Sequence, residues 1–200
     1  PRVLRESLID GLLINYHREA PDEISKLIRS YKLPTVWLNV RREDYCVHPA
    51  DQQAGRKAAK LLLEAGHRRI AYVSHHGQRH YSILDRCEGV EQVLSEAGLS
   101  LKIRSLEDNY AVPRGVEQVL RWLDRPERPT AVICYEQQEA AAVYVAASKL
   151  GLEVPRDLSL IAFGNDVMRQ QIGLPISTFI VPFEALGRTA MDCLCDLIDG

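Results

Sequence analysis

The sequence has no long uninterrupted apolar run. Its apolar runs are short, as at Gly11–Ile14, at Leu61–Leu63 and at Ala140–Ala147, which includes one Tyr. A helix that spans a membrane needs ~20 consecutive apolar residues. We therefore predict that this chain does not cross a membrane and has no membrane partner.

The sequence also has no excess of charge of one sign. It carries 25 Lys and Arg against 27 Asp and Glu, for a formal net charge of −2. The chain therefore has no global basic field of the kind that attracts nucleic acid phosphates. If nucleic acid is a partner, we expect another segment to bind it.

The common cofactor and nucleophile motifs are missing. The chain contains no G-x-G-x-x-G, no G-K-[ST] and no G-x-S-x-G pattern. Nothing in the order of Ser, His and acidic residues places a nucleophile beside a base. We predict that the protein is not an enzyme and needs no cofactor, although an α/β scaffold does not by itself fix function.

What the sequence does contain is typical of a globular protein. Its 200 residues are 46% apolar and 26% charged, which excludes a disordered or collagen-like chain. A chain of this length can bury ~70% of its unfolded surface without a disulfide or metal. The cysteines are odd in number and lie in apolar stretches, which predicts buried thiols in a reducing cytoplasm. They are Cys46, Cys87, Cys134, Cys193 and Cys195.

Two clusters resemble metal sites only superficially. His75, His76 and His80 form an H-H-x-x-x-H pattern, but no Cys or acidic residue stands at ligand spacing. Cys193 and Cys195 lie in one amphipathic stretch and would point ~200° apart on a helix. We interpret the histidines as a polar loop and the two cysteines as packing residues, and predict no metal.

Apolar runs alternate with amphipathic stretches along the whole chain. This alternation predicts an α/β fold with parallel strands joined by helices, in one sheet or two. The expected buried strands are Gly11–Asn15, Thr35–Asn39, Ile70–Ser74, Leu101–Ser105, Thr130–Cys134 and Leu158–Phe163. The expected helices are Glu23–Tyr31, Gln52–Ala65, Arg86–Ala97, Gly115–Leu123, Glu139–Leu150 and Phe183–Ile198.

A polar cluster, Gly164-Asn165-Asp166, follows the last of these strands. Ligands of α/β proteins bind beyond the carboxyl ends of strands, so this cluster is a candidate site. An ordinary Asn-Asp turn explains the same residues equally well.

Several segments, read in order, resemble the effector domain of the lactose-repressor (LacI/GalR) family of transcriptional regulators. They are Asp10–Tyr16 (DGLLINY), Ala65–Val73 (AGHRRIAYV), Arg86–Gly89 (RCEG), Pro129–Cys134 (PTAVIC), Leu150–Phe163 (LGLEVPRDLSLIAF), the residues Pro175, Ser177 and Thr178, and the pair Pro182 and Gly187. Together these matches cover nearly the whole chain.

The resemblance implies a fold and a division into domains. We expect two periplasmic-binding-protein-like subdomains, each a parallel sheet flanked by helices, with a ligand cleft between them. Residues 1–67 and 182–200 would form the N-terminal subdomain, incomplete here, and residues 68–181 the C-terminal one. The family's helix-turn-helix and hinge helix have no counterpart in the chain, which begins at Pro1, so we expect a segment to precede it.

The resemblance also implies a set of effector contacts. An acidic residue and a cleft arginine of the family correspond to Asp51 and Arg86, and we expect Arg86 to lie in the cleft rather than in the core. The other expected contacts are Tyr110, Glu136, Asn165 and Phe183. An ordinary helix cap or a packed aromatic remains the alternative for each position.

The chain departs from the family pattern at two pairs. The family's N-D pair reads Glu136-Gln137 here, and its D-D pair reads Gly164-Asn165. Both changes alter polar contacts, so we expect that an ordinary hexose does not fit.

The function implied by the resemblance is the effector-binding and dimerisation core of a LacI-type repressor. Its effector would be a small polar metabolite, with a sugar or sugar derivative as the expected class, and operator DNA would be bound by the helix-turn-helix. A homodimer would form along Glu139–Leu150 and Met168–Ile172, although an Ala-rich helix buried within the subunit explains the first segment equally well. The alternative is a periplasmic-type sugar-binding protein of a transport system, against which the unpaired cysteines argue.

Overall fold

A computed structural model describes residues 9–15, 22–75, 80–106, 112–167, 170 and 173–200. The chain divides into two compact units. Unit 1 comprises Pro1–Pro49 and Pro182–Gly200, and unit 2 comprises Ala50–Val181.

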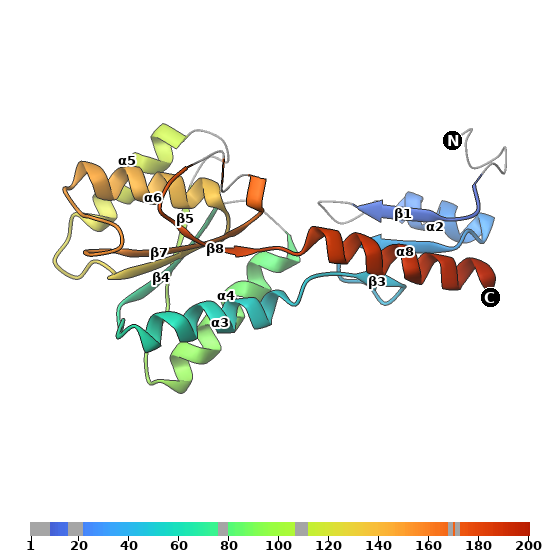
Figure 1. Cartoon of the computed structure of the whole chain (residues 1–200), viewed down its shortest axis with the longest axis horizontal. Helices are drawn as coiled ribbons and strands as arrows, with labels where there is room; N and C mark the ends of the chain where they lie inside the picture. The colour runs from blue at the N-terminus through green and yellow to red at the C-terminus, as the bar shows by residue number, and fades with distance from the viewer. Residues whose placement is uncertain (1–8, 16–21, 76–79, 107–111, 168–169, 171–172) are drawn as a thin grey trace. The chain divides into compact units, whose positions relative to one another are not determined.

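Each unit is built on one parallel sheet, which answers whether the strands form one sheet or two (Figure 1). The strands are β1 Leu12–Asn15, β2 Thr35–Leu38, β3 Cys46–Val47, β4 Ile70–His75, β5 Lys102–Leu106, β6 Ala131–Cys134, β7 Ser159–Gly164 and β8 Ser177–Ile180. The helices are α2 Asp22–Tyr31, α3 Asp51–Glu64, α4 Tyr81–Glu96, α5 Val112–Leu123, α6 Gln137–Lys149 and α8 Phe183–Asp199. The order is β1-β2-β3 in unit 1 and β5-β4-β6-β7-β8 in unit 2, with every pair parallel. We did not predict β3, which has only two residues, or β8, which begins with the polar residues Ser177 and Thr178 and contains no buried residue.

The sheet of unit 2 is covered by helices on both faces. Alternate residues of a strand point to opposite sides, so each face of the sheet contributes apolar side chains to its own core. Figure 1 shows α5 and α6 on one side and α3 and α4 on the other. The strand residues in the α5–α6 core are Ala71, Val73, Leu106, Val132, Cys134, Leu160 and Ala162. Those in the α3–α4 core are Ile70, Tyr72, Ala131, Ile133, Ile161 and Phe163.

Two expectations of burial are wrong. The expected buried strand Gly11–Asn15 contains no buried residue, since its side chains are half-buried or exposed. Lys102–Ser105 of β5 are exposed, and only Leu106 of this strand is buried. The reason is its position, since β5 pairs with β4 alone at one edge of the sheet. An edge strand carrying Lys102 and Arg104 also presents charge that discourages pairing with another chain.

The helices α3 and α4 cross unusually closely. A Cβ atom on Gly55 would overlap the main-chain carbonyl of Arg86, and one on Gly89 would overlap that of Gln52. Because α3 packs on α4 in this way, it belongs to unit 2. The first junction between the units therefore lies between residues 49 and 50, whereas we expected it between residues 67 and 68.

The alanines of α6 pack inside unit 2. Ala140, Ala142, Val143, Ala146 and Ala147 are buried in the core that also contains Val116 and Val119 of α5. Packing within the subunit therefore accounts for the Ala-rich face. The side of α6 that reaches the surface carries Val145.

A histidine joins the amino ends of two strands in unit 2. His67 lies 2.9 Å from Thr130 Oγ1 through Nδ1 and 2.9 Å from Ser159 Oγ through Nε2. Gly66 precedes it with φ of +89°, a conformation that favours glycine. The Gly66-His67 pair therefore ends α3 and leads the chain into β4.

In unit 1, α8 packs against the sheet through a small core. Val36, Ala190 and Leu194 are buried there, with Leu38, Val47 and Leu197 around them. Gly11 lies so close to Leu194 that a Cβ atom on it would overlap the leucine side chain.

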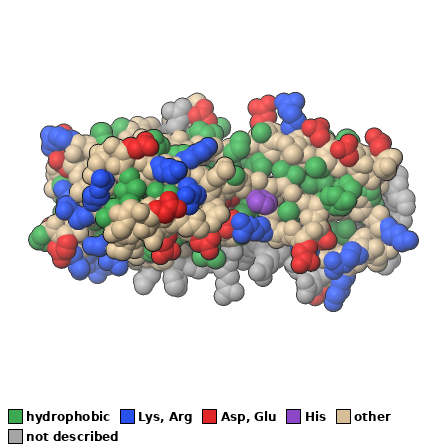
Figure 2. Space-filling view, turned by 90° about the horizontal axis from the view of Figure 1, so that it is seen from below, with side chains coloured by type: hydrophobic (Ala, Val, Ile, Leu, Met, Phe, Trp, Pro, Cys, Tyr) green, Lys and Arg blue, Asp and Glu red, His purple; other side chains and the backbone are tan. Residues whose placement is uncertain are grey.

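Three surface findings bear on the sequence expectations. No helix in the described part of the chain is long and apolar enough to cross a membrane. Cys134 is buried, Cys46, Cys87 and Cys193 are half-buried and Cys195 is exposed, so the expectation of buried thiols holds fully only for Cys134 and is wrong for Cys195. On the face shown in Figure 2, Lys and Arg side chains are intermingled with Asp and Glu, so that face offers no extended basic area.

Candidate functional site

Polar side chains gather where three neighbouring strands of unit 2 end. The strands β4, β6 and β7 lie side by side, and their carboxyl ends lead to His75, to Tyr135-Glu136-Gln137 and to Gly164-Asn165. This edge of an α/β sheet is the usual position of a ligand site. The α4 helix adds Ser82 and Arg86, and the start of α3 adds Asp51.

Arg86 and Asp51 form a buried ion pair. Arg86 Nε donates to Asp51 Oδ1 at 2.7 Å, and Arg86 Nη1 donates to the main-chain oxygen of Tyr135 at 3.0 Å. The guanidinium also lies 4.9 Å from the ring centre of Tyr135 and 4.6 Å from that of Phe163. Arg86 is 6% exposed and Asp51 is 2% exposed, so the charge of the arginine is balanced inside unit 2.

Our expectation that Arg86 lies outside the core is therefore wrong. The expected helix began at Arg86, but α4 begins at Tyr81, after His80 with extended backbone angles. Arg86 thus lies in the second turn of α4, with its side chain between α3, β6 and β7. Sequence comparison pairs each residue with the family but does not reveal that the two pair with each other.

A chain of hydroxyl groups lies beside this ion pair. Ser82 Oγ is 2.9 Å from Tyr135 Oη and 2.6 Å from His80 Nδ1. Burial raises the pKa of Tyr135, and burial followed by the charge of Asp51 raises the pKa of Tyr81. Both phenols therefore stay protonated near neutral pH and can donate hydrogen bonds.

Glu136 is the N-cap residue of α6 and forms a capping box with Glu139. The side chain of Glu136 accepts from the Glu139 main-chain N–H, and the Glu136 N–H donates to Glu139 Oε2 at 3.1 Å. This reciprocal arrangement satisfies main-chain donors that a helix start leaves open. The carboxylate of Glu136, an expected effector contact, thus takes part in helix capping.

Glu139 is completely buried beside a histidine. Its Oε1 atom lies 3.6 Å from His75 Nε2. Burial raises the pKa of Glu139 from 4.5 to about 8, and burial lowers the pKa of His75. Near neutral pH both groups are therefore mainly uncharged.

Gln137 fills the space above Gly164. Its Nε2 donates to the main-chain oxygen of Asn165 at 3.1 Å, and a Cβ atom on Gly164 would overlap the amide of Gln137. The other amide atom, Oε1, is buried and has no hydrogen-bond partner among the described residues. The two departures from the family pattern therefore lie in contact with each other.

Two expected contacts are not among the residues gathered at these strand ends in the described part of unit 2. Phe183 is the first residue of α8 in unit 1 and is 52% exposed, while Tyr110 lies outside the described residues. Our sequence analysis did not assign Tyr135, Phe163 or Gln137 to the site. Only their position at the carboxyl ends of strands indicated them.

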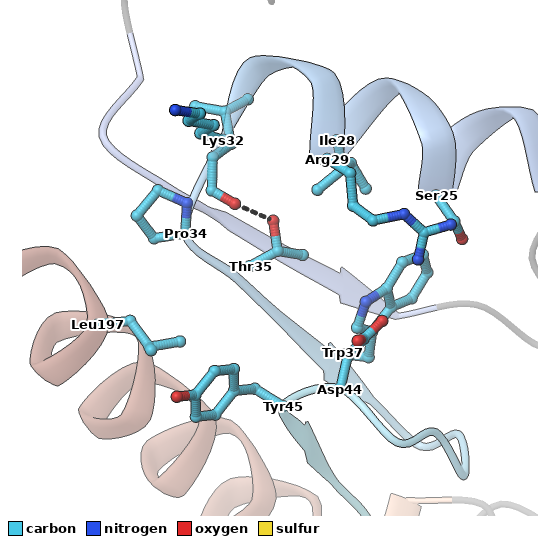
Figure 3. Close-up of a pocket in the computed structure, with 11 residues that line it drawn as sticks. Ser25, Ile28, Arg29, Lys32, Pro34, Thr35, Trp37, Asp44, Tyr45 and Leu197 are labelled. Atoms are coloured by element: carbon cyan, nitrogen blue, oxygen red, sulfur yellow. Dashed lines mark hydrogen bonds between the residues drawn. The ribbon is translucent and has the colours of Figure 1, made fainter.

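A separate pocket of about 360 Å³ lies in unit 1 and contains none of the expected contacts. Figure 3 shows side chains of α2 and β2, including Ile28 and Thr35, facing it, with Tyr45 and Leu197 on another side. The guanidinium carbon of Arg42 lies over the ring of Trp37, 4.3 Å from the ring centre, and Arg42 Nη2 donates to Ser25 Oγ at 3.0 Å.

Metal ligation has no support in the part of the chain that the structure describes, where no group of three or more His, Cys, Asp or Glu side chains could hold an ion. Of the three histidines in the H-H-x-x-x-H pattern, His76 lies outside the described residues. His80 instead contacts Ser82.

Comparison with known proteins identifies the family. Residues 59–200 match the model of the periplasmic binding protein-like domain. The chain is 26% identical over 201 residues to the HTH-type transcriptional repressor PurR of Photobacterium profundum, covering 98% of this chain and 60% of the relative. It is 32% identical over 146 residues to the ribose operon repressor of Haemophilus influenzae, covering 72% of this chain and 43% of that protein.

A solved structure agrees with these sequence matches. A regulatory protein of the LacI family from Chloroflexus aggregans superposes with a TM-score of 0.86 at 25% identity, covering all of this chain and 72% of that one. The chain thus spans about 60% of the length of the first repressor above. It belongs to the periplasmic binding protein-like domain family, among the LacI-family transcriptional regulators.

Proposed function

We propose that the chain is the effector-binding and dimerisation core of a cytoplasmic LacI-type repressor. The observation that carries this proposal is the polar cluster at the carboxyl ends of β4, β6 and β7. Its central Arg86–Asp51 pair is held by two hydrogen bonds and two aromatic rings. The effector would be a small polar metabolite, with a sugar or sugar derivative as the expected class.

The chemistry of this cluster suits recognition through hydrogen bonds. It combines a neutralised ion pair, protonated phenols and an amide, which donate and accept hydrogen bonds. Tyr135 and Phe163 add apolar ring surface next to the polar atoms. Such a mixture of apolar walls and a few fixed polar groups is typical of small-molecule sites.

Regulation requires that the effector bind one arrangement of the protein more tightly than another. The coupling between effector and operator sites is typically ~1–3 kcal/mol. In this proposal, operator DNA is bound by a helix-turn-helix outside these 200 residues, and a homodimer carries the change to it. The surface of α6 available for dimerisation carries Val145.

A thermal-shift screen of metabolites tests effector binding. Sugars, sugar derivatives, nucleosides and purine bases would each be added to the purified chain. A ligand at 100 times its Kd adds ~2.7 kcal/mol of stability, which raises Tm by a few degrees. We expect at least one compound of the panel to do this, and a panel without any shift would contradict the proposal.

Two aromatic variants make the screen specific. Phe183 and Tyr45 are both exposed aromatics of unit 1, but only Phe183 is an expected contact. Phe183→Ala should leave the Tm of the free protein nearly unchanged and reduce the shift caused by the hit. Tyr45→Ala should leave both values unchanged.

The second candidate function is a periplasmic-type sugar-binding protein of a transport system. The matching family model favours this second function, because the description of the model names periplasmic binding proteins. The native N-terminus separates the two functions. A helix-turn-helix there would support the repressor, and an apolar signal segment would support the transport protein.

A further inference from the structure

The amide of Gln137 is oriented by its surroundings. The main-chain oxygen of Asn165 needs a donor, so the NH₂ end of the amide must face it, as the 3.1 Å contact records. This leaves Oε1 as the end of the amide that has no partner in the described part of the chain. Gln137 is 3% exposed, and a buried acceptor of this kind is normally satisfied by a donor.

The position of Gln137 depends on the absence of a side chain at residue 164. A Cβ atom on Gly164 would lie within 2.4 Å of both Cδ and Oε1 of Gln137, closer than any real contact. The two residues therefore act as a unit in which glycine makes the room that the amide occupies.

The charges of the described strand ends do not favour an anion. Arg86 is the only Lys or Arg among residues 74–75, 80–86, 134–139 and 164–167, and Asp51 already neutralises it at 2.7 Å. The same segments contain the acidic residues Asp85, Glu136 and Asp166. An incoming phosphate or carboxylate would meet no uncompensated cation among these residues.

We propose that Gln137, held over Gly164, is a specificity-determining residue of the effector site, and that it selects an effector without negative charge that donates a hydroxyl or amino hydrogen bond to Oε1. This inference rests on the proposed effector-binding function. It narrows the ligand class to neutral polyols and their amino derivatives, and excludes sugar phosphates and sugar acids.

Matched ligands test the charge rule. The chain would be titrated with glucose, glucosamine, glucose 6-phosphate and gluconate, and with the corresponding neutral, amino and anionic members of the galactose and ribose series. We expect a rise in Tm with a neutral or amino member of at least one series, and none with its anionic partners. An anionic member that stabilises the chain more than its neutral parent would overturn the inference while leaving effector binding intact.

If none of these sugars and sugar derivatives binds, the inference is also overturned, because the inference names neutral polyols and their amino derivatives as the ligand class. The wider metabolite screen described above would then decide alone whether the chain binds an effector. The two failures are therefore distinguishable.

Variants of Gln137 test its role in specificity. Gln137→Glu adds a negative charge at the contact and should raise the preference for the amino over the neutral ligand by about tenfold, measured as a ratio of Kd values by calorimetry. Gln53→Glu adds the same charge at an exposed position of α3 and should leave the ratio unchanged. An unchanged ratio in Gln137→Glu would refute the assignment.

A second variant keeps the test valid if Gln137→Glu does not fold. Gln137→Met keeps the length of the side chain without the amide and should weaken binding of the neutral ligand by about tenfold. Gly164→Ala should weaken it similarly by displacing the amide. In a chain that already carries Gln137→Ala, the alanine at residue 164 should have no further effect on affinity, and a full additional loss there would contradict the coupling of the two positions.

Discussion

We expect a substitution at Arg86 to change the stability of the protein as well as its affinity for an effector. Its guanidinium compensates the charge of Asp51, which is almost completely buried. Removing one member of a buried ion pair leaves the other charge without compensation, and this typically costs about 3–5 kcal/mol. A variant at this position therefore reports on stability as well as on effector affinity.

We predict that Arg86→Ala lowers the free energy of unfolding by about 3–5 kcal/mol, measured by urea denaturation. The matched control is Arg56→Ala, which removes an exposed pair with Glu96 at 3.0 Å and should cost less than ~1 kcal/mol. Equal losses for the two variants would show that the Arg86–Asp51 pair does not stabilise unit 2.

Glu139 gives unit 2 a predictable dependence on pH. Its pKa is about 8 in the folded protein and 4.5 without burial, so the folded state retains a proton that the unfolded state releases. The stability that this group contributes is fully present below pH 4.5 and is lost as the pH rises towards 8.

We predict that the free energy of unfolding falls by about 2 kcal/mol between pH 6.5 and 8.5 because of Glu139. Glu139→Gln keeps an oxygen for the Glu136 N–H and removes the ionisation, so this fall should disappear. His75, whose pKa is lowered by burial, changes stability in the opposite sense and mainly below pH 6.5. Parallel pH profiles for the wild type and Glu139→Gln would contradict the prediction.

At the scale of elements, the crossing of α3 and α4 fixes the distance between Asp51 and Arg86. Asp51 lies on α3 and Arg86 on α4, and the two helices approach closely only because Gly55 and Gly89 lack side chains. A shift of one helix against the other would move the carboxylate away from the guanidinium. The ion pair thus depends on two glycines that do not touch it.

We predict that Gly55→Ala destabilises the protein by about 1–3 kcal/mol, because the methyl group overlaps the Arg86 carbonyl. Gly187→Ala is the control, since a Cβ atom there would meet nothing within 4 Å inside α8. Alanine at that position should stabilise the protein by up to ~1 kcal/mol through helix propensity. Thermal denaturation of both variants decides the matter, and a loss in both would point to a cause other than the crossing.

At the scale of the whole molecule, the proposed dimer depends on the surface that α6 leaves exposed. The α6 helix fills the core of unit 2 with one face and leaves Val145 at the surface. If the surface face of α6 around Val145 forms the proposed dimer, a charged side chain at residue 145 would be buried in the interface without a partner.

We predict that the chain sediments as a dimer and that Val145→Arg shifts it to the monomer, measured by sedimentation velocity. Leu84→Arg replaces another exposed apolar residue, on α4, and should leave the dimer intact. A Val145→Arg variant that remains dimeric would exclude α6 from the interface.

Local patterns were enough to predict most of the elements. Ala58 and Leu62 are four residues apart in the sequence and both are buried on α3. A glycine follows each of α3 and α4, at Gly66 and Gly98. The strand Cys46–Val47 was missed because two residues are too few for a period to show. The strand Ser177–Ile180 was missed because it begins with two polar residues and contains no buried one. The start of α4 was placed five residues late, since the pattern from Val90 onward does not extend to its first turn.

The α/β class, the parallel strands and the resemblance to LacI-family regulators were determined by the sequence alone, because each depends on residue order along the chain. The tertiary structure decided which distant polar groups meet: Arg86 with Asp51, and Gln137 with the main chain over Gly164. These partners are up to 35 residues apart in sequence, and no local pattern links them. They meet because parallel strands bring their carboxyl ends to one edge, and burial there makes each unpaired charge too costly to leave uncompensated.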